Sequence, residues 1–116
     1  LKEFSGTEDR IEHVRKLTIQ HEKVAPVWFI YGRSLSDSGD LHSALSAFQK
    51  AAELDPGDPG NHLAVAGAYE SLHDYISAVE AYKVAAAIAP QDAQIKERLA
   101  NALRDSEVGK DIPASP

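Results

Sequence analysis

The sequence contains no cysteine, which excludes disulfide bonds and thiolate metal sites and leaves the redox compartment undetermined. It also contains no methionine, even at position 1, so we expect a fragment or a processed form of a longer chain. No apolar run approaches the roughly 20 residues that cross a bilayer, and we therefore expect no membrane insertion. The N-terminus shows no secretory pattern of basic start, apolar block and cleavage site, which slightly favours the cytoplasm.

The sequence also lacks an excess of positive charge. Its 12 Lys and Arg residues stand against 18 Asp and Glu residues, and the net charge is -6. Residues 25–90 hold only three basic but eight acidic side chains. Binding to nucleic-acid phosphates requires clustered Lys and Arg. We therefore expect no nucleic-acid partner, and the acidic balance is typical of a charge that keeps a protein in solution.

What the sequence does contain is an internal repeat. The stretch AAELDPGDPG begins at Ala51, and its relative AAAIAPQDAQ begins at Ala85, 34 residues later. When residues 25–58 are aligned with residues 59–92, eight of the 34 positions are identical. The identical pairs are Asp40/Asp74, Ser43/Ser77, Ala44/Ala78, Ala47/Ala81, Ala51/Ala85, Ala52/Ala86, Pro56/Pro90 and Asp58/Asp92. A fixed period of this length is typical of proteins built from stacked structural repeats.

Each repeat predicts two helices separated by a tight turn. In residues 25–58, the first helix is indicated by large and small residues spaced i, i+3, i+4 and i+7, which are Trp28, Tyr31, Gly32 and Leu35. The stretch Ser38-Gly39-Asp40 breaks this pattern, and Asp40 is the expected N-cap of the second helix. In residues 59–92, His73-Asp74 is expected to make the same turn.

The prolines predict where one pair of helices ends and the next begins. Pro56 disfavours α geometry in the residue before it, so the second helix should end near Asp55. Asp58 should cap the following helix, with Pro59 at its first position, where a missing N–H costs nothing. The alanines recur because paired helices must approach closely at those points.

These residues resemble the tetratricopeptide repeat, whose 34-residue pattern reads W-x2-L-G-x2-Y, then A-x3-F, then A and P. The first unit holds Trp28, Tyr31, Gly32, Leu35, Ala44, Phe48, Ala51 and Pro56 at these positions. The second holds His62, Val65, Ala66, Tyr69, Ala78, Tyr82, Ala85 and Pro90. The resemblance implies an all-α solenoid of antiparallel helix hairpins.

The same register extends in both directions and gives about six helices in one domain, residues 7–106. We expect a half unit at 7–24 with a helix from Asp9 to Glu22, full repeats at 25–58 and 59–92, and a capping helix at 93–106. Residues 1–6 are expected to be a flexible N-terminus, and residues 107–116, with two prolines and a glycine, a disordered tail.

The resemblance implies a concave surface that binds a peptide or helix of a partner protein and is lined by the first helix of each unit. Its expected lining is Phe29, Ile30, Arg33, Asp37, Leu63, Ala64, Gly67, Glu70, Arg98, Asn101 and Arg104. Apolar and small residues together predict a shallow apolar depression, and the arginines could bond carboxylates. Two alternatives stay open: Phe29 and Ile30 could pack against the N-terminal helix, and the arginines could simply be solvated.

One branch of the family is disfavoured. Tetratricopeptide domains that bind chaperone tails resemble one another in a clamp of Lys and Asn that grips a terminal carboxylate. The matching places here hold Phe29, Arg33 and Ala64 instead. Arg98 lies near one basic place of the third helix, but a single cation does not make a clamp.

The sequence offers little to support catalysis or metal binding. It has no G-x-S-x-G, no phosphate-binding loop and no H-E-x-x-H. The five histidines lack ligand spacing, which favours structural or solvated roles. We predict a non-catalytic adaptor or scaffold without metal or cofactor. The alternative is a segment of a longer solenoid, or a domain that self-associates through its end helices.

Overall fold

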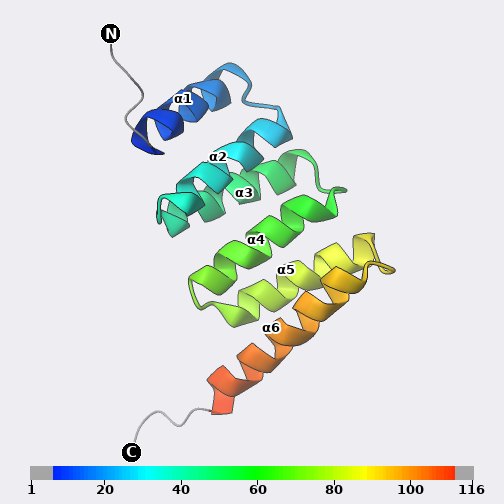
Figure 1. Cartoon of the computed structure of the whole chain (residues 1–116). Coiled ribbons are helices and arrows are strands. Elements are labelled where there is room, and N and C mark those ends of the chain that lie inside the picture. The colour runs from blue at the N-terminus through cyan, green and yellow to red at the C-terminus, as the bar shows by residue number, and fades with distance from the viewer. Residues whose placement is uncertain (1–6, 112–116) are drawn as a thin grey trace, which may run out of the picture.

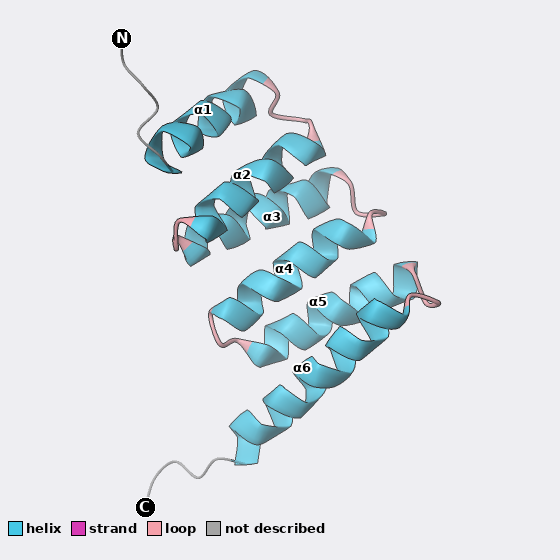
Figure 2. Ribbon diagram, in the orientation of Figure 1, coloured by secondary structure: helices cyan, strands magenta, loops and turns pink. Residues whose placement is uncertain are grey.

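The computed structural model describes residues 7–111 and folds them into six helices joined by short loops (Figure 1). The helices are α1 (Thr7–Gln20), α2 (Ala25–Asp37), α3 (Leu41–Leu54), α4 (Pro59–Ser71), α5 (Tyr75–Ile88) and α6 (Ala93–Asp111). These residues form no strand, as Figure 2 shows, and none of their helices is long and apolar enough to cross a membrane. The predicted all-α solenoid of six helices is confirmed. Residues 1–6 and 112–116, which include parts of the predicted flexible ends, lie outside the described residues.

The 34-residue period extends through all six helices. Helices α1, α3 and α5 begin at residues 7, 41 and 75, and α2, α4 and α6 begin at residues 25, 59 and 93. Each helix packs against the next one, and α2 also touches α4. Figure 1 shows α2, α4 and α6 following one another in one layer, with α3 and α5 behind them. Helix α1 therefore stands in the register of a second helix, as the half-unit prediction requires.

Two helix boundaries differ from the prediction. Helix α1 begins at Thr7 and ends at Gln20, two residues earlier at each end than expected. Helix α6 continues to Asp111, so the expected end at residue 106 is wrong and residues 107–111 are helical. The physical reason is that Gly109 alone does not stop a helix, since glycine inside a helix costs only about 1 kcal/mol. The next strong helix breaker in the sequence is Pro113.

Aspartates cap the helices at equivalent places of the repeat. The carboxylate of Asp40 accepts a hydrogen bond from the Ser43 backbone N at 3.3 Å, and Asp74 accepts one from the Ser77 backbone N at 3.2 Å. Asp58 Oδ1 likewise accepts from the backbone N of Gly60 at 2.9 Å at the start of α4. Each bond satisfies a backbone N–H that has no partner within the helix. The caps predicted at Asp40 and Asp58 are confirmed.

The turn inside each hairpin requires a left-handed residue. Gly39 has φ of +89°, and His73, 34 residues later, has φ of +63°. Glycine adopts this conformation at little cost, whereas a residue with a Cβ is strained there. The repeat thus keeps the backbone geometry of the turn even where it does not keep the glycine.

The alanines of the second helices form the closely packed centre of each hairpin. Ala44, Ala51, Ala78 and Ala85 are completely buried in α3 and α5. The large side chains between them are also inside, since Phe48 is 6% and Tyr82 is 1% exposed. Burying such a side chain contributes about 1.5–3 kcal/mol each. These two rings hold the helix pairs together at the positions where the family pattern places an aromatic residue.

Polar side chains join consecutive units. The Asn61 side chain is 5% exposed, and its Nδ2 donates to the carbonyls of Ala51 at 3.3 Å and Asp55 at 3.1 Å. These carbonyls belong to the end of α3, where backbone acceptors lack helical partners. Trp28 is only half-buried, and its Nε1 donates to the Glu22 carbonyl at 2.9 Å, which ties α2 to the loop after α1.

Candidate functional site: the face formed by α2, α4 and α6

The face formed by α2, α4 and α6 contains a hollow of about 610 Å³, which we call the larger hollow. Its walls come from α2, α4 and α6, the first helices of the three units, and Phe48 of α3 contributes to its lining. Six of the residues expected on the concave surface line it, namely Phe29, Leu63, Ala64, Gly67, Glu70 and Arg98. The structure therefore brings together residues from three helices that the sequence separates by up to 69 positions, from 29 to 98.

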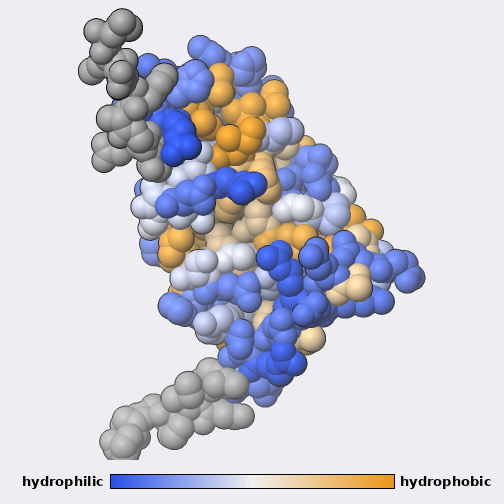
Figure 3. All heavy atoms as spheres, in the orientation of Figure 1, coloured by the Kyte–Doolittle hydropathy of each residue, from blue (hydrophilic) through white to orange (hydrophobic). Residues whose placement is uncertain are grey.

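Small side chains on α4 open this hollow. Ala64 and Gly67 line its wall, and a Cβ added to Gly67 would have no other atom within 4 Å. Figure 3 shows pale and orange spheres in the middle of this face, over α2 and α4, with blue spheres over α6. The predicted shallow apolar depression is therefore present in the shape and hydropathy of this face. Its use as a binding site stays a prediction.

Phe29 packs on α3. Its ring centroid lies 5.6 Å from that of Phe48, with the planes tilted by 57°. Such tilted aromatic contacts add to the stability gained from burial alone. Ile30 beside it is 52% exposed and forms no part of the core. Phe29 thus has a partner on α3, and the alternative that these two side chains pack against the N-terminal helix stays open.

A smaller hollow of about 240 Å³ lies beside the first one, at the junction of α2 with the turn between α3 and α4. Phe29 and Gly60 line both hollows, so the two adjoin. Ile30 lines only the smaller one, together with Pro26. Asp55 and Asp58 also line it.

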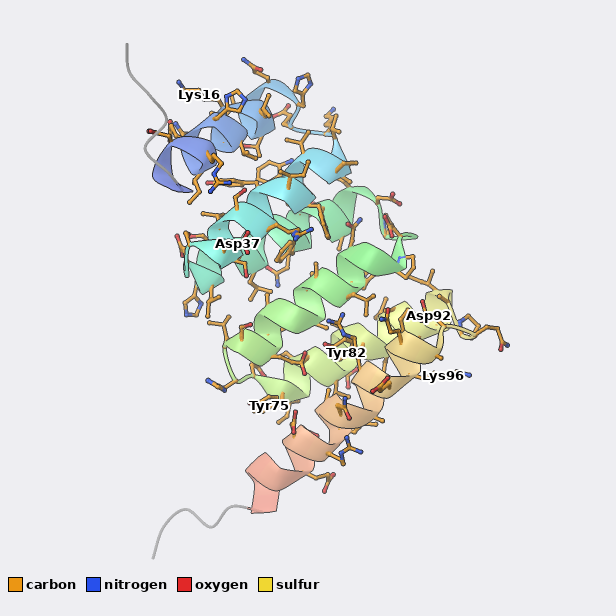
Figure 4. The ribbon with its side chains drawn as sticks, in the orientation of Figure 1. Lys16, Asp37, Tyr75, Tyr82, Asp92 and Lys96 are labelled. Carbon is orange, nitrogen blue, oxygen red and sulfur yellow. The ribbon has the colours of Figure 1, made fainter. Side chains whose placement is uncertain are left out.

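The carboxylate of Glu70 is already engaged within the larger hollow. Its Oε1 accepts a hydrogen bond from the hydroxyl of Tyr82 on α5. Burial of the hydroxyl, and then this hydrogen bond and the negative charge of Glu70, raise the pKa of Tyr82 far above its usual range. Figure 4 labels Tyr82 behind α4 and α6. Glu70 is thus fixed in position, whereas Arg98 across the hollow is exposed.

Four residues expected on the concave surface line neither hollow. They are Arg33, Asp37, Asn101 and Arg104. Arg33 and Asp37 are exposed on α2. The guanidinium of Arg104 donates instead to the Asn101 side chain within α6. Their place in a binding surface stays a prediction.

The sequence interpretation missed the residues of the α3–α4 turn. Asp55 and Asp58 of this turn line the smaller hollow together with Gly60 of α4, yet the two aspartates had already been explained by a helix end and a cap. Pro56 was a signal for this turn, because it ends α3 and so places the turn between the end of α3 and the start of α4. What the sequence could not give was the neighbouring surface of α2.

Among the side chains that the structure describes, no three His, Asp or Glu residues gather in a way that could hold a metal ion. Two of the histidines have structural neighbours. The Nε2 of His62 lies 2.8 Å from the Pro56 carbonyl oxygen, and the Nδ1 of His73 lies 3.1 Å from the Tyr75 hydroxyl oxygen. Both contacts stabilise turns.

The family is decided by a match of the tetratricopeptide repeat profile to residues 35–102, more than half of the chain. The chain belongs to the tetratricopeptide repeat family. The match covers α3, α4 and α5 completely and includes the end of α2 and the first half of α6. No curated protein matches the chain by sequence.

Several solved structures are similar to this chain in fold. MamA is similar with a TM-score of 0.81 and 20% identity, over 89% of this chain and 60% of that one. The CopN–Scc3 complex contains a chain with a TM-score of 0.71 and 26% identity, over 84% of this chain and 58% of that one.

The type III secretion chaperone SycD of Yersinia enterocolitica, in complex with a peptide of the translocator YopD, has a TM-score of 0.77 and 16% identity. That alignment covers 90% of this chain and 82% of SycD. The present chain thus spans about 60% of the length of MamA and of the matched chain in the CopN–Scc3 complex.

Proposed function

We propose that this chain is a non-catalytic protein-interaction module that holds a peptide or helix of a partner in the larger hollow. The observation that carries the proposal is the hollow itself, which is open, lined by three helices and apolar at its centre. An apolar depression of this kind accommodates a bulky side chain of a bound segment.

The similar structures support this proposal. SycD was solved with a peptide of another protein, and a similar chain occurs in the CopN–Scc3 complex. Stacked helical repeats form extended surfaces of this type and use them for binding. For the present chain, the partner and the bound segment are part of the proposal.

The lining residues favour an occupant with apolar side chains at its centre. Leu63 supplies apolar surface, while Ala64 and Gly67 leave room beside it. Arg98 stands at the edge of the hollow and is exposed, so its guanidinium is available to a carboxylate of the bound segment. Nothing in this arrangement resembles a nucleophile with a base and an oxyanion site, which catalysis would require.

A substitution that fills the hollow without harming the fold tests the proposal. Gly67→Gln places a long side chain where a Cβ meets no other atom, and glutamine favours a helix over glycine. The matched control is Ala87→Gln, which puts the same side chain on an exposed position of α5. The probes are peptides selected on the purified chain from a random display library, measured by fluorescence anisotropy.

We expect Gly67→Gln to weaken peptide binding at least about tenfold, the equivalent of about 1.4 kcal/mol. The control should bind as the unaltered chain does, and circular dichroism should show both variants folded. If peptides bind Gly67→Gln with unchanged affinity, they do not occupy the larger hollow and the proposal is wrong.

The alternative function, a segment of a longer solenoid or a self-associating domain, also has an observation in its favour. Ala100 and Leu103 of α6 are exposed, Leu103 by 42%. Their counterparts 34 residues earlier are Ala66, which is completely buried, and Tyr69, which is half-buried. Sedimentation over a hundredfold range of concentration separates the possibilities: a mass that rises with concentration, and that falls again in Leu103→Glu, would favour self-association.

A further inference from the structure

The smaller hollow places an apolar wall opposite two carboxylates. Pro26, Phe29 and Ile30 of α2 form the wall, and Asp55 and Asp58 come from the turn between α3 and α4. Its volume of about 240 Å³ lies below the roughly 300–1,000 Å³ that is usual for small-molecule sites. A space of this size suits one long side chain of a bound segment.

The charge of this hollow is negative. Asp55 and Asp58 lie in its lining, where the described residues include no Lys, Arg or His. Asp58 uses one oxygen to cap α4 through the Gly60 backbone N, and a carboxylate can accept several further hydrogen bonds. The larger hollow differs, because Glu70 and Arg98 both line it and their charges offset each other.

We propose that the smaller hollow binds a lysine or arginine side chain of the partner segment. The aliphatic stem would lie on Phe29 and Ile30, and the cationic end would meet Asp55 and Asp58. Long basic side chains combine these two properties, because their stems are apolar and their ends are charged. An aliphatic residue would leave the two negative charges unneutralised, and an acidic residue would be repelled by them.

This inference rests on the proposed function, because the two hollows adjoin one another. Phe29 and Gly60 line both of them. A segment that lies in the larger hollow can therefore extend past Phe29 and place its next side chains in the smaller one. The partner is thus expected to carry a basic residue beside its apolar anchor.

The pair of aspartates occurs where α2 meets the α3–α4 turn, but not at the equivalent junction of α4 with the α5–α6 turn. In the second unit, the counterpart of Asp55 is Ala89, and that of Gly60 is Gln94. The junction of α4 with the α5–α6 turn therefore has one carboxylate fewer and a long side chain in place of a glycine. A basic residue of the partner would bind at the junction with two aspartates and not at the other. This preference would fix the position of the bound segment along the face.

Paired variants test the inference with little risk to the fold. Asp55→Asn with Asp58→Asn removes both charges at nearly constant size, and asparagine caps a helix about as well as aspartate. The matched control is Glu53→Gln with Asp92→Asn, which removes the same two charges outside the hollow. Asp92 is the repeat counterpart of Asp58 and caps α6 through the Gln94 backbone N at 2.9 Å.

The probes are display-selected peptides that bind the unaltered chain and lose binding in Gly67→Gln. Each peptide is compared with a version in which its basic residue is replaced by norleucine, which keeps the aliphatic stem and removes the charge. We expect about a tenfold loss of affinity from the norleucine peptide or from the Asp55→Asn/Asp58→Asn chain, and no further loss when both are combined. The control chain should bind like the unaltered one.

The outcomes separate this inference from the proposed function. If the norleucine peptide loses affinity equally for the unaltered chain and for Asp55→Asn/Asp58→Asn, or if selected peptides lack basic residues, the basic-residue inference is wrong while groove binding stands. If no selected peptide depends on Gly67, or none is selected at all, both the inference and the proposed function are contradicted.

Discussion

Gly32 of α2 lies against the ring of Phe48 of α3, so close that a Cβ on Gly32 would stand 2.6 Å from Phe48 Cδ1. The ring has little room to move, because it is 6% exposed and Phe29 packs on it. In the second unit Ala66 and Tyr82 take these places, and both are buried. The first hairpin thus depends on the absence of a side chain at one position.

This contact predicts that Gly32→Ala destabilises the protein. The methyl group overpacks the contact, and overpacking typically costs about 1–3 kcal/mol. Alanine favours a helix over glycine by about 1 kcal/mol, so we expect a net loss of up to about 2 kcal/mol. The measurement is urea unfolding followed by circular dichroism. Gly67→Ala is the control, since its Cβ meets nothing within 4 Å and it should gain stability; a gain in both variants would contradict the contact.

The turn at Gly39 leads to a second prediction. With φ of +89°, this position disfavours any residue that carries a Cβ, and we expect Gly39→Ala to lower the free energy of unfolding by about 1 kcal/mol. Space is not the cause, because no atom lies within 4 Å of the added Cβ. Gly57→Ala, also in an open place, should be neutral or stabilising. Thermal unfolding of the two variants compares them directly, and equal melting temperatures would argue against the strain.

The buried Asn61 provides a third prediction. Its side chain donates to two carbonyls at the end of α3, and replacing it by alanine removes both of these hydrogen bonds. We expect Asn61→Ala to cost about 1–3 kcal/mol. The control is Asn101→Ala on α6, whose side chain bonds only at the exposed surface and should change stability by less than about 0.5 kcal/mol. Guanidinium unfolding measures both, and a similar cost in both variants would show that the bonds of Asn61 contribute little.

The hydroxyl of Tyr82 makes stability depend on alkaline pH. Burial and the hydrogen bond to Glu70 raise its pKa in the folded state. The protonated hydroxyl therefore favours folding, and this contribution is fully present below the unfolded-state pKa of about 10 and is lost as pH rises above it. The loss is about 1.4 kcal/mol for each pH unit above 10 until the folded hydroxyl ionises.

The test of this pH dependence is Tyr82→Phe, a change to the residue type that the first unit carries at this position. Unfolding free energies are measured by urea denaturation at pH 9 and pH 11 for both chains. The unaltered chain should lose more stability than Tyr82→Phe over this interval. Identical pH slopes would mean that the hydroxyl ionises normally in the folded protein.

The helix ends could be predicted because the signals that set them act within a few residues. Asp40 and Asp58 cap helices through hydrogen bonds to residues two or three positions away, and Pro56 acts on the residue before it. The predicted end of α6 was wrong because it relied too strongly on a local signal. A glycine at position 109 was given the weight of a helix breaker, although a single glycine does not end a helix.

The candidate site was predictable in part. The alternation of large and small residues along α4 correctly indicated a depression at Leu63, Ala64 and Gly67. It did not indicate that Phe29 would turn its ring onto Phe48 or that Arg104 would bond to Asn101. Those choices depend on rotamers and on neighbouring helices, which a periodic pattern does not specify.

The sequence by itself determined the repeat period, the helices and the family, because helix caps, prolines and apolar spacing are local properties of the chain. Only the tertiary structure decided that the turn at Asp55 and Asp58 lies beside Ile30, and that Glu70 is held by the Tyr82 hydroxyl. These neighbours are set by how successive hairpins stack on one another. The stacking follows from the summed packing of many side chains, Gly32 against Phe48 among them, and no single stretch of sequence contains it.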